Sequence, residues 1–95
     1  MEIKEAQNMM RRIYLERDSE RGVDFALLRT FQELAELNYA VLENEGESSV
    51  ADELADVLAW TCSLANLLNI DLAQALYSKY SDVCSECGQS PCICP

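Results

Sequence analysis

Apolar residues recur every three or four positions along most of this chain, which is the spacing of one face of an α-helix. The pattern predicts a first helix from Ile3 to about Asp18, and turn-forming residues then predict a turn over Ser19–Gly22. No segment carries a strand signal. The sequence therefore predicts an all-α fold.

A second helix is predicted from Asp24, a residue type that favours the N-cap, to about Asn44. The polar segment 43–49 predicts an exposed loop, with Ser48 or Ser49 as the N-cap of the next helix. The two helices on either side of this short loop are expected to be neighbours.

The third predicted helix, Val50–Asn69, is apolar on almost every side and yet contains Glu53 and Asp56. A helix apolar all round is normally buried, and in a chain of 95 residues this predicts burial against another subunit. Burying isolated carboxylates costs several kcal/mol unless they are paired, protonated or bound to a metal. These two acids therefore require a partner, and a shared cation is one.

Asp71 and Gln74 have the spacing of a helix cap and predict a fourth helix that runs to about Tyr80. Beyond this helix the composition changes, and four of the five cysteines crowd into the last residues with Gly, Pro and Ser. The chain is thus expected to comprise a helical domain, 1–82, and a cysteine-rich tail, 83–95.

The net charge of −10 opposes binding to nucleic acid polymers and to anionic membranes. It favours cations, which can themselves carry the phosphates of a free nucleotide. The chain has no histidine, which excludes imidazole acid–base chemistry and every zinc site that needs a histidine ligand. No apolar run is long enough to span a bilayer and the N-terminus lacks the features of a signal peptide, so a cytoplasmic location is expected.

Two acidic pairs share one spacing, Glu33 with Glu36 and Glu53 with Asp56. Three residues of helix advance about 300° and about 4.5 Å, so both carboxylates of each pair lie on one face. Four carboxylates on facing helices suit Mg²⁺, which prefers oxygen ligands. The alternative is that these residues are ordinary exposed acids in a chain rich in Glu.

Cys84, Cys87, Cys92 and Cys94 form a CxxC followed by a CxC. Four thiolates can close tetrahedrally on Zn²⁺, and such a closed site is structural. In a cytosolic protein this spacing favours a metal over disulfides, although disulfides or an unliganded tail remain alternatives.

The chain resembles the MazG-like nucleoside triphosphate pyrophosphohydrolases over nearly its whole length. The family pattern is EExxE, a variable spacer and ExxD; this chain has QELAE at 32–36 and ELAD at 53–56, with sixteen residues between them. ERDSERG at 16–22, the segment 53–72, the SKY before the tail and the CxxCG…PCxC element are also similar to a short subfamily. The chain departs from the pattern at Gln32, where the first Glu often occurs.

The resemblance implies a four-helix bundle completed by oligomerisation, as a homodimer or a homotetramer. It also implies hydrolysis of nucleoside triphosphates between the α and β phosphates, with Mg²⁺ or Mn²⁺ as cofactor, to give a nucleoside monophosphate and pyrophosphate. Removal of non-standard nucleotides is a role that such an activity serves.

In the site that the resemblance implies, the magnesium ligands are Glu33, Glu36, Glu53 and Asp56. Glu36 and Glu53 are the expected catalytic residues, since Glu36 or a neighbouring carboxylate can accept a proton from the attacking water. The sequence does not choose among these carboxylates.

Three further residues are candidate substrate contacts, and each has a structural alternative. Lys79 is expected near phosphate, but it also suits the last turn of a helix. Asn66 follows the acidic pair on the third helix, but its side chain can instead pair with backbone. Trp60 can stack on a base, although in so apolar a helix it also suits the core or an interface.

A second function is consistent with the same residues. The cysteine tail resembles a docking element, so the chain could be a catalytically weak or inactive helical oligomer that acts as a zinc-tailed interaction protein. The four acids and the negative charge favour the enzyme.

Overall fold

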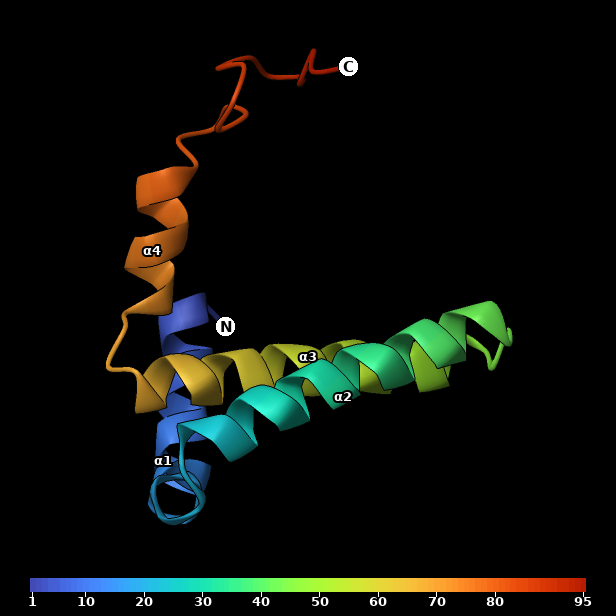
Figure 1. Cartoon of the computed structure of the whole chain (residues 1–95). Helices are drawn as coiled ribbons and strands as arrows, with labels where there is room; N and C mark the ends of the chain where they lie inside the picture. Colours follow the sequence, from blue (N-terminus) through green and yellow to red (C-terminus); the bar gives the residue numbers. More distant parts are fainter.

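The computed structural model describes all 95 residues and contains no strand. Its helices are α1 (Ile3–Arg21), α2 (Val23–Leu42), α3 (Glu47–Leu67) and α4 (Leu72–Lys79). α2 and α3 lie side by side as a long arm, α1 crosses this arm, and α4 with the tail extends away from it (Figure 1). The prediction of an all-α, four-helix chain with a cysteine-rich tail is confirmed.

The junction between α1 and α2 is shorter than predicted. The predicted turn at 19–22 is wrong, because α1 continues to Arg21 and Gly22 alone separates the two helices. Gly22 has a φ of 94°, which glycine adopts without strain. Asp24 lies inside the first turn of α2 and makes no capping bond, so its predicted N-cap role is also wrong.

The loop between α2 and α3 also ends earlier than predicted. Gly46 takes the N-cap position of α3, so the prediction of Ser48 or Ser49 there is wrong. The Ser49 hydroxyl instead donates to a carboxylate oxygen of Glu45 at 2.8 Å. At the start of α4 the predicted cap is confirmed, because an Asp71 carboxylate oxygen accepts from the next turn of backbone at 3.1 Å.

A buried polar network holds α1 across α3. The Gln7 amide nitrogen donates to Asn66 Oδ1 at 3.0 Å and to the Ile70 carbonyl at 2.7 Å. Gln7 Oε1 accepts from the Leu72 N–H at 2.9 Å, and the Asn66 amide nitrogen donates to the Gln7 carbonyl at 3.0 Å. These bonds tie three helices together, and the hydrophobic pattern gives no indication of them.

The apolar core of the single chain is small. Its buried apolar residues are Ala26, Ala40, Cys62 and Ala65. The radius of gyration is 15.4 Å, whereas a compact domain of this length has about 12 Å. The chain exposes 6942 Å², roughly 1400 Å² more than a compact monomer of its mass.

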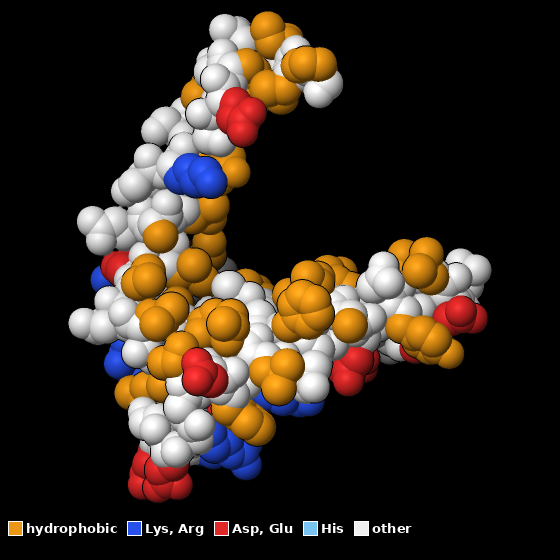
Figure 2. Space-filling view, in the orientation of Figure 1, with side chains coloured by type: hydrophobic (Ala, Val, Ile, Leu, Met, Phe, Trp, Pro, Cys, Tyr) orange, Lys and Arg blue, Asp and Glu red, His pale blue; other side chains and the backbone are white.

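Large apolar side chains remain exposed on both helices of the arm, with Leu54 and Leu58 of α3 about half exposed. Hydrophobic side chains gather along the concave side of the molecule, over the arm and α4 (Figure 2). The burial predicted for α3 is therefore not reached within one chain, and its burial against another subunit stays a prediction. None of the four helices combines the length and apolarity needed to cross a membrane.

Candidate active site

Three carboxylates converge where α2 faces α3. Glu33, Glu53 and Asp56 each place one oxygen so that the three oxygens lie within 4.8 Å of one another. The convergence follows from the local sequence: a short loop folds α3 back on α2, and the spacing of three residues puts Glu53 and Asp56 on the same face. Oxygen ligands of this kind suit Mg²⁺ or Mn²⁺.

Two of these carboxylates have a buried oxygen with no hydrogen-bond partner, Glu33 Oε2 and Glu53 Oε2. Buried polar atoms are almost always satisfied, because an unpaired one loses its hydration without compensation. A divalent cation would satisfy both oxygens at once. The donor set and its two unpaired oxygens therefore fit a metal.

The charge state of the site gives the same indication. Burial raises the pKa of Glu33, and the neighbouring Glu36 and Asp56 raise it further, while Arg29 lowers it. Burial likewise raises the pKa of Glu53, followed by the charges of Glu36 and Asp56. Ionising all the carboxyls of the cluster is therefore unfavourable unless a cation is bound.

The fourth predicted ligand, Glu36, lies beside the cluster and outside the group of three converging oxygens. Its side chain is exposed, and its hydrogen bond and charge act on Glu33. The structure thus brings three predicted ligands together and places the fourth at their rim.

Arg29 is a site residue that the sequence pattern did not single out. Its guanidinium donates from Nη2 to Glu33 Oε1 at 2.8 Å and from Nη1 to Gln32 Oε1 at 2.9 Å. The spacing of four residues between Arg29 and Glu33 is the signal that could have revealed this ion pair.

A hollow of about 180 Å³ opens beside the cluster, between α1 and α3. Its lining includes Asp56, Trp60, Tyr14 and Arg17. The guanidinium of Arg17 lies 4.2 Å from the Tyr14 ring centroid and 5.5 Å from that of Trp60, and it pairs with the buried Asp18 at 2.9 Å. The predicted stacking residue Trp60 therefore borders an aromatic and cationic hollow next to a carboxylate of the cluster.

The other two candidate substrate contacts lie elsewhere. Asn66 is buried, and its amide is bonded to Gln7 and Arg11 of α1. Lys79 lies in the last turn of α4, which extends away from the α2–α3 arm (Figure 1). The structure does not bring Asn66 or Lys79 to the carboxylates within one chain.

The tail gathers Cys84, Cys87, Cys92 and Cys94, with the four sulfur atoms within 4.8 Å of one another. The sulfurs of Cys84 and Cys94 are 3.7 Å apart, and those of Cys87 and Cys92 are 3.9 Å apart. Sulfurs at the corners of a tetrahedron around Zn²⁺ are about 3.8 Å apart. The cluster could therefore hold a metal ion.

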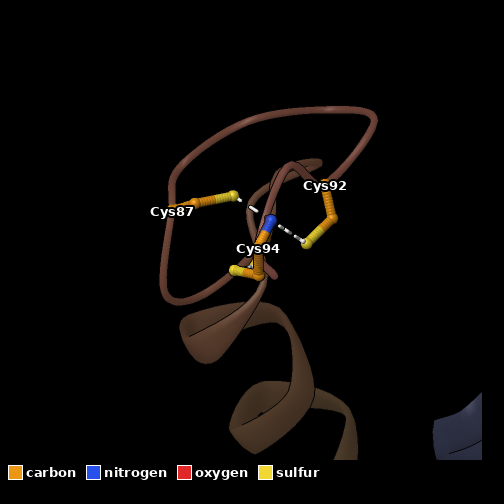
Figure 3. A group of neighbouring side chains, drawn as sticks. Cys87, Cys92 and Cys94 are labelled. Carbon is orange, nitrogen blue, oxygen red and sulfur yellow. Dashed lines mark hydrogen bonds between the residues drawn. The ribbon is translucent and has the colours of Figure 1, made fainter.

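Backbone N–H groups prepare these sulfurs to bind as thiolates. The N–H groups of Cys87 and Glu86 lower the pKa of Cys84 to about 6. Those of Ile93 and Gln89 lower the pKa of Cys87. Figure 3 shows Cys87, Cys92 and Cys94 converging on the inside of the tail loop, with the Cys94 N–H donating to the Cys92 sulfur at 3.3 Å.

The sulfur cluster as a whole does not favour four thiolates. The pKa of Cys94 is raised, chiefly by its hydrogen bond with Cys92 and then by Cys84. Because the neighbouring sulfurs oppose another negative charge, the fully ionised set requires a cation to stabilise it.

The chain is thus an all-α protein with two clusters that could each hold a metal ion, one of carboxylates between two helices and one of cysteines in the tail. The family model of the MazG nucleotide pyrophosphohydrolase domain matches residues 22–87, and the chain belongs to this family. The match includes both acidic pairs and the first two tail cysteines, and it begins after α1. A search of curated protein sequences finds no match to the chain. Family membership indicates nucleotide pyrophosphohydrolase chemistry.

Proposed function

We propose that this protein is a magnesium-dependent nucleoside triphosphate pyrophosphohydrolase that releases a nucleoside monophosphate and pyrophosphate. The observation that carries the proposal is the pair of buried, unpartnered oxygens of Glu33 and Glu53, which converge with Asp56 inside a MazG domain. An anionic substrate approaches such an acidic site favourably only together with cations. Mn²⁺ would suit the same oxygen ligands.

The four acids would serve two purposes, to bind the cation and to accept a proton from the attacking water. Glu33, Glu53 and Asp56 would hold the cation with Glu36 at the rim, and the bound cation would neutralise the triphosphate and acidify a water. Glu36 is exposed beside Glu33, so it can accept the proton of the attacking water, with Glu53 as the second candidate. The water oxygen bonds to phosphorus, the anhydride P–O bond breaks, and its electron pair leaves with pyrophosphate.

The nucleotide would lie over the Trp60 hollow, with its phosphates toward Asp56. The hollow of about 180 Å³ is smaller than the ~300 Å³ at which ligand pockets begin. A second copy of the chain would complete it, and this is also the route by which Lys79 could reach phosphates. Asn66 would affect substrate binding indirectly, because it is bonded to α1 and Arg17 of α1 lines the hollow.

Oligomerisation, as a homodimer or a dimer of dimers, is the second part of the proposal. The excess exposed surface of roughly 1400 Å² exceeds the ~800 Å² that each partner buries in a standard interface. Exposed apolar side chains on α2, including Phe31, Leu34 and Val41, border an open groove of about 520 Å³. A second copy would cover this apolar surface.

For the tail we propose a structural Zn²⁺ bound by the four cysteines, with residues 83–95 as a separate metal-stabilised unit after a helical domain of residues 1–82. The sulfur spacings and the lowered pKa values of Cys84 and Cys87 support this assignment. Free thiols and such a site suit the reducing conditions of the cytoplasm.

The decisive assay measures pyrophosphate release from a panel of ribo-, deoxyribo- and modified triphosphates, with and without Mg²⁺. Glu53→Gln should abolish release, whereas Glu43→Gln, an exposed acid outside the cluster, should not. The panel also tests whether non-standard nucleotides are preferred. No metal-dependent release from any triphosphate would overturn the activity and favour a helical interaction protein with a zinc tail.

A further inference from the structure

Arg29 is the positive side chain in direct contact with the carboxylate cluster. Its Nη2 lies 2.8 Å from Glu33 Oε1, and the Glu33 side chain is only 6% exposed. Its Nη1 is held by Gln32 Oε1 at 2.9 Å. The guanidinium is thus anchored on both sides, by one carboxylate and one neutral amide.

The two oxygens of Glu33 have different surroundings. Oε1 accepts from Arg29, whereas Oε2 is buried and has no partner. A divalent cation can therefore bind at Oε2 while Arg29 stays at Oε1. The cation and the guanidinium would then share one carboxylate, and their repulsion would weaken cation binding as long as no anion lies between them.

Arg29 also lies close to the Trp60 ring, beside the hollow in which the nucleotide would bind. Its guanidinium carbon lies 5.6 Å from the ring centroid of Trp60, which borders the hollow together with Asp56. A planar guanidinium can bind phosphate through two parallel hydrogen bonds. The other guanidinium near this ring, that of Arg17, is already neutralised by the buried Asp18.

We propose that Arg29 is a built-in cation of the site, which weakens divalent-cation binding in the free protein and becomes a phosphate ligand when cation and nucleotide bind together. This inference rests on the proposed function, since it names the side chain that couples the two ligands. Gln32 supports it by accepting from Nη1 without adding a negative charge. A Glu at this position, as in the family pattern, would offset the charge of Arg29 and make the cluster more attractive to cations.

The test is a pair of titrations on the full-length protein. Mn²⁺ binding is measured by the paramagnetic resonance of free Mn²⁺, and binding of inorganic tripolyphosphate is then measured by calorimetry at saturating Mn²⁺. Arg29→Gln should bind Mn²⁺ about tenfold more tightly and tripolyphosphate about tenfold more weakly than the unmodified protein. Arg12→Gln, the same charge change on an exposed residue of α1, should alter neither affinity.

Two further variants separate charge from geometry. Arg29→Lys keeps the charge and loses the planar fork, so Mn²⁺ affinity should stay near that of the unmodified protein while tripolyphosphate affinity falls. Gln32→Glu should shift both affinities in the direction of Arg29→Gln. Any of three results would overturn the inference. Arg29→Gln could bind Mn²⁺ no more tightly than the unmodified protein, Arg29→Gln could bind tripolyphosphate equally well, or Arg12→Gln could show the same shifts.

These readouts involve no turnover, so they separate this inference from the proposed activity. If the shifts occur while no triphosphate yields pyrophosphate, the activity is wrong and the role of Arg29 stands. If pyrophosphate is released while the shifts are absent, the activity stands and the role of Arg29 is wrong.

Discussion

Gln7 and Asn66 form two hydrogen bonds between α1 and α3: the Gln7 side-chain amide donates to Asn66 Oδ1 at 3.0 Å, and the Asn66 side-chain amide donates to the backbone carbonyl of Gln7 at 3.0 Å. Both residues are buried. The pair holds α1, and with it Arg17 and Tyr14 of the hollow, in place beside the carboxylate cluster. Loss of this pair should therefore lower the stability of the fold.

Replacing Asn66 with Ala should lower the free energy of unfolding by about 1–3 kcal/mol, because the buried Gln7 amide loses one acceptor and the Gln7 carbonyl one donor. Urea unfolding at fixed protein concentration measures the change. Asn8→Ala, at an exposed position of α1 next to Gln7, should be nearly neutral. Equal stability of the Asn66 variant would show that the pair does not hold α1. A higher KM with unchanged stability would instead favour the direct substrate contact predicted from the sequence.

The raised pKa values of Glu33 and Glu53 give the metal-free protein a specific pH dependence. Their ordinary value is 4.5, and above it the unfolded chain releases protons that the folded chain still holds. Stability should therefore fall as pH rises from 4.5 through the raised pKa values, so in EDTA the melting temperature should be lower at about pH 7.5 than at about pH 5.

Other acids also titrate in this range, so the comparison needs a matched variant. A Glu33→Gln, Glu53→Gln double variant should lose most of this slope. Mg²⁺ at about pH 7.5 should raise the melting temperature of the unmodified protein and leave the double variant unchanged. A slope that persists in the double variant would assign it to the remaining acids.

The helices and the acidic cluster could be predicted because they depend on local spacing. Hydrophobic periodicity located all four helices, and the cap at Asp71 was predicted correctly because it is a local bond. Gly22 and Gly46 lie in the predicted turn and loop, but they take the N-cap positions predicted for Asp24 and for Ser48 or Ser49, with φ values of 94° and 101°. Polar residues are the commoner N-caps, so the sequence favours them.

What the sequence could not supply is set by contacts between distant segments. The hydrogen bond from Gln7 to Asn66 joins residues 59 positions apart, and the local sequence around neither residue indicates it. The same holds for the hollow, because its lining joins Tyr14 and Arg17 of α1 to Trp60 of α3. The ion pair of Arg29 with Glu33 was visible as a spacing of four residues, but only burial distinguishes it from an ordinary surface pair.

The tail cysteines should bind about one zinc per chain, as elemental analysis can determine. After chelation, Cys84 should be alkylated fastest at neutral pH, because its pKa of about 6 makes it mostly thiolate there. Its alkylation should slow as pH falls below 6. Cys62 should react slowly, because burial raises its pKa and blocks access.

Zinc should protect all four tail thiols from alkylation, and Cys84→Ser should remove much of this protection. Mass spectrometry of alkylated peptides locates each modified thiol. Cys62→Ser is the matched control and should retain zinc. Tail disulfides with no bound zinc would contradict the metal assignment.

Trp60 is the only tryptophan, so its fluorescence reports on its own surroundings. If a base stacks on it, a non-hydrolysable analogue of the preferred triphosphate should quench the emission in the presence of Mg²⁺. Trp60→Ala should raise KM roughly tenfold or more, since stacking on an aromatic side chain contributes about 1–3 kcal/mol, and Trp60→Phe should recover much of the loss. Unchanged KM in both variants would assign Trp60 to packing.

The exposed apolar surface of α2 predicts the outcome of a single charge substitution. Phe31 is 73% exposed and borders the α2 groove, so Phe31→Glu cannot disturb a core within the chain. If a second copy covers this surface, the buried charge should weaken association by several kcal/mol. Light scattering coupled to size exclusion should then show a shift toward monomer. Glu43→Gln, at an exposed residue just beyond α2, should retain the oligomer. An unchanged oligomer in Phe31→Glu would place the interface elsewhere, and a protein already monomeric before substitution would remove the proposal that a second copy completes the hollow.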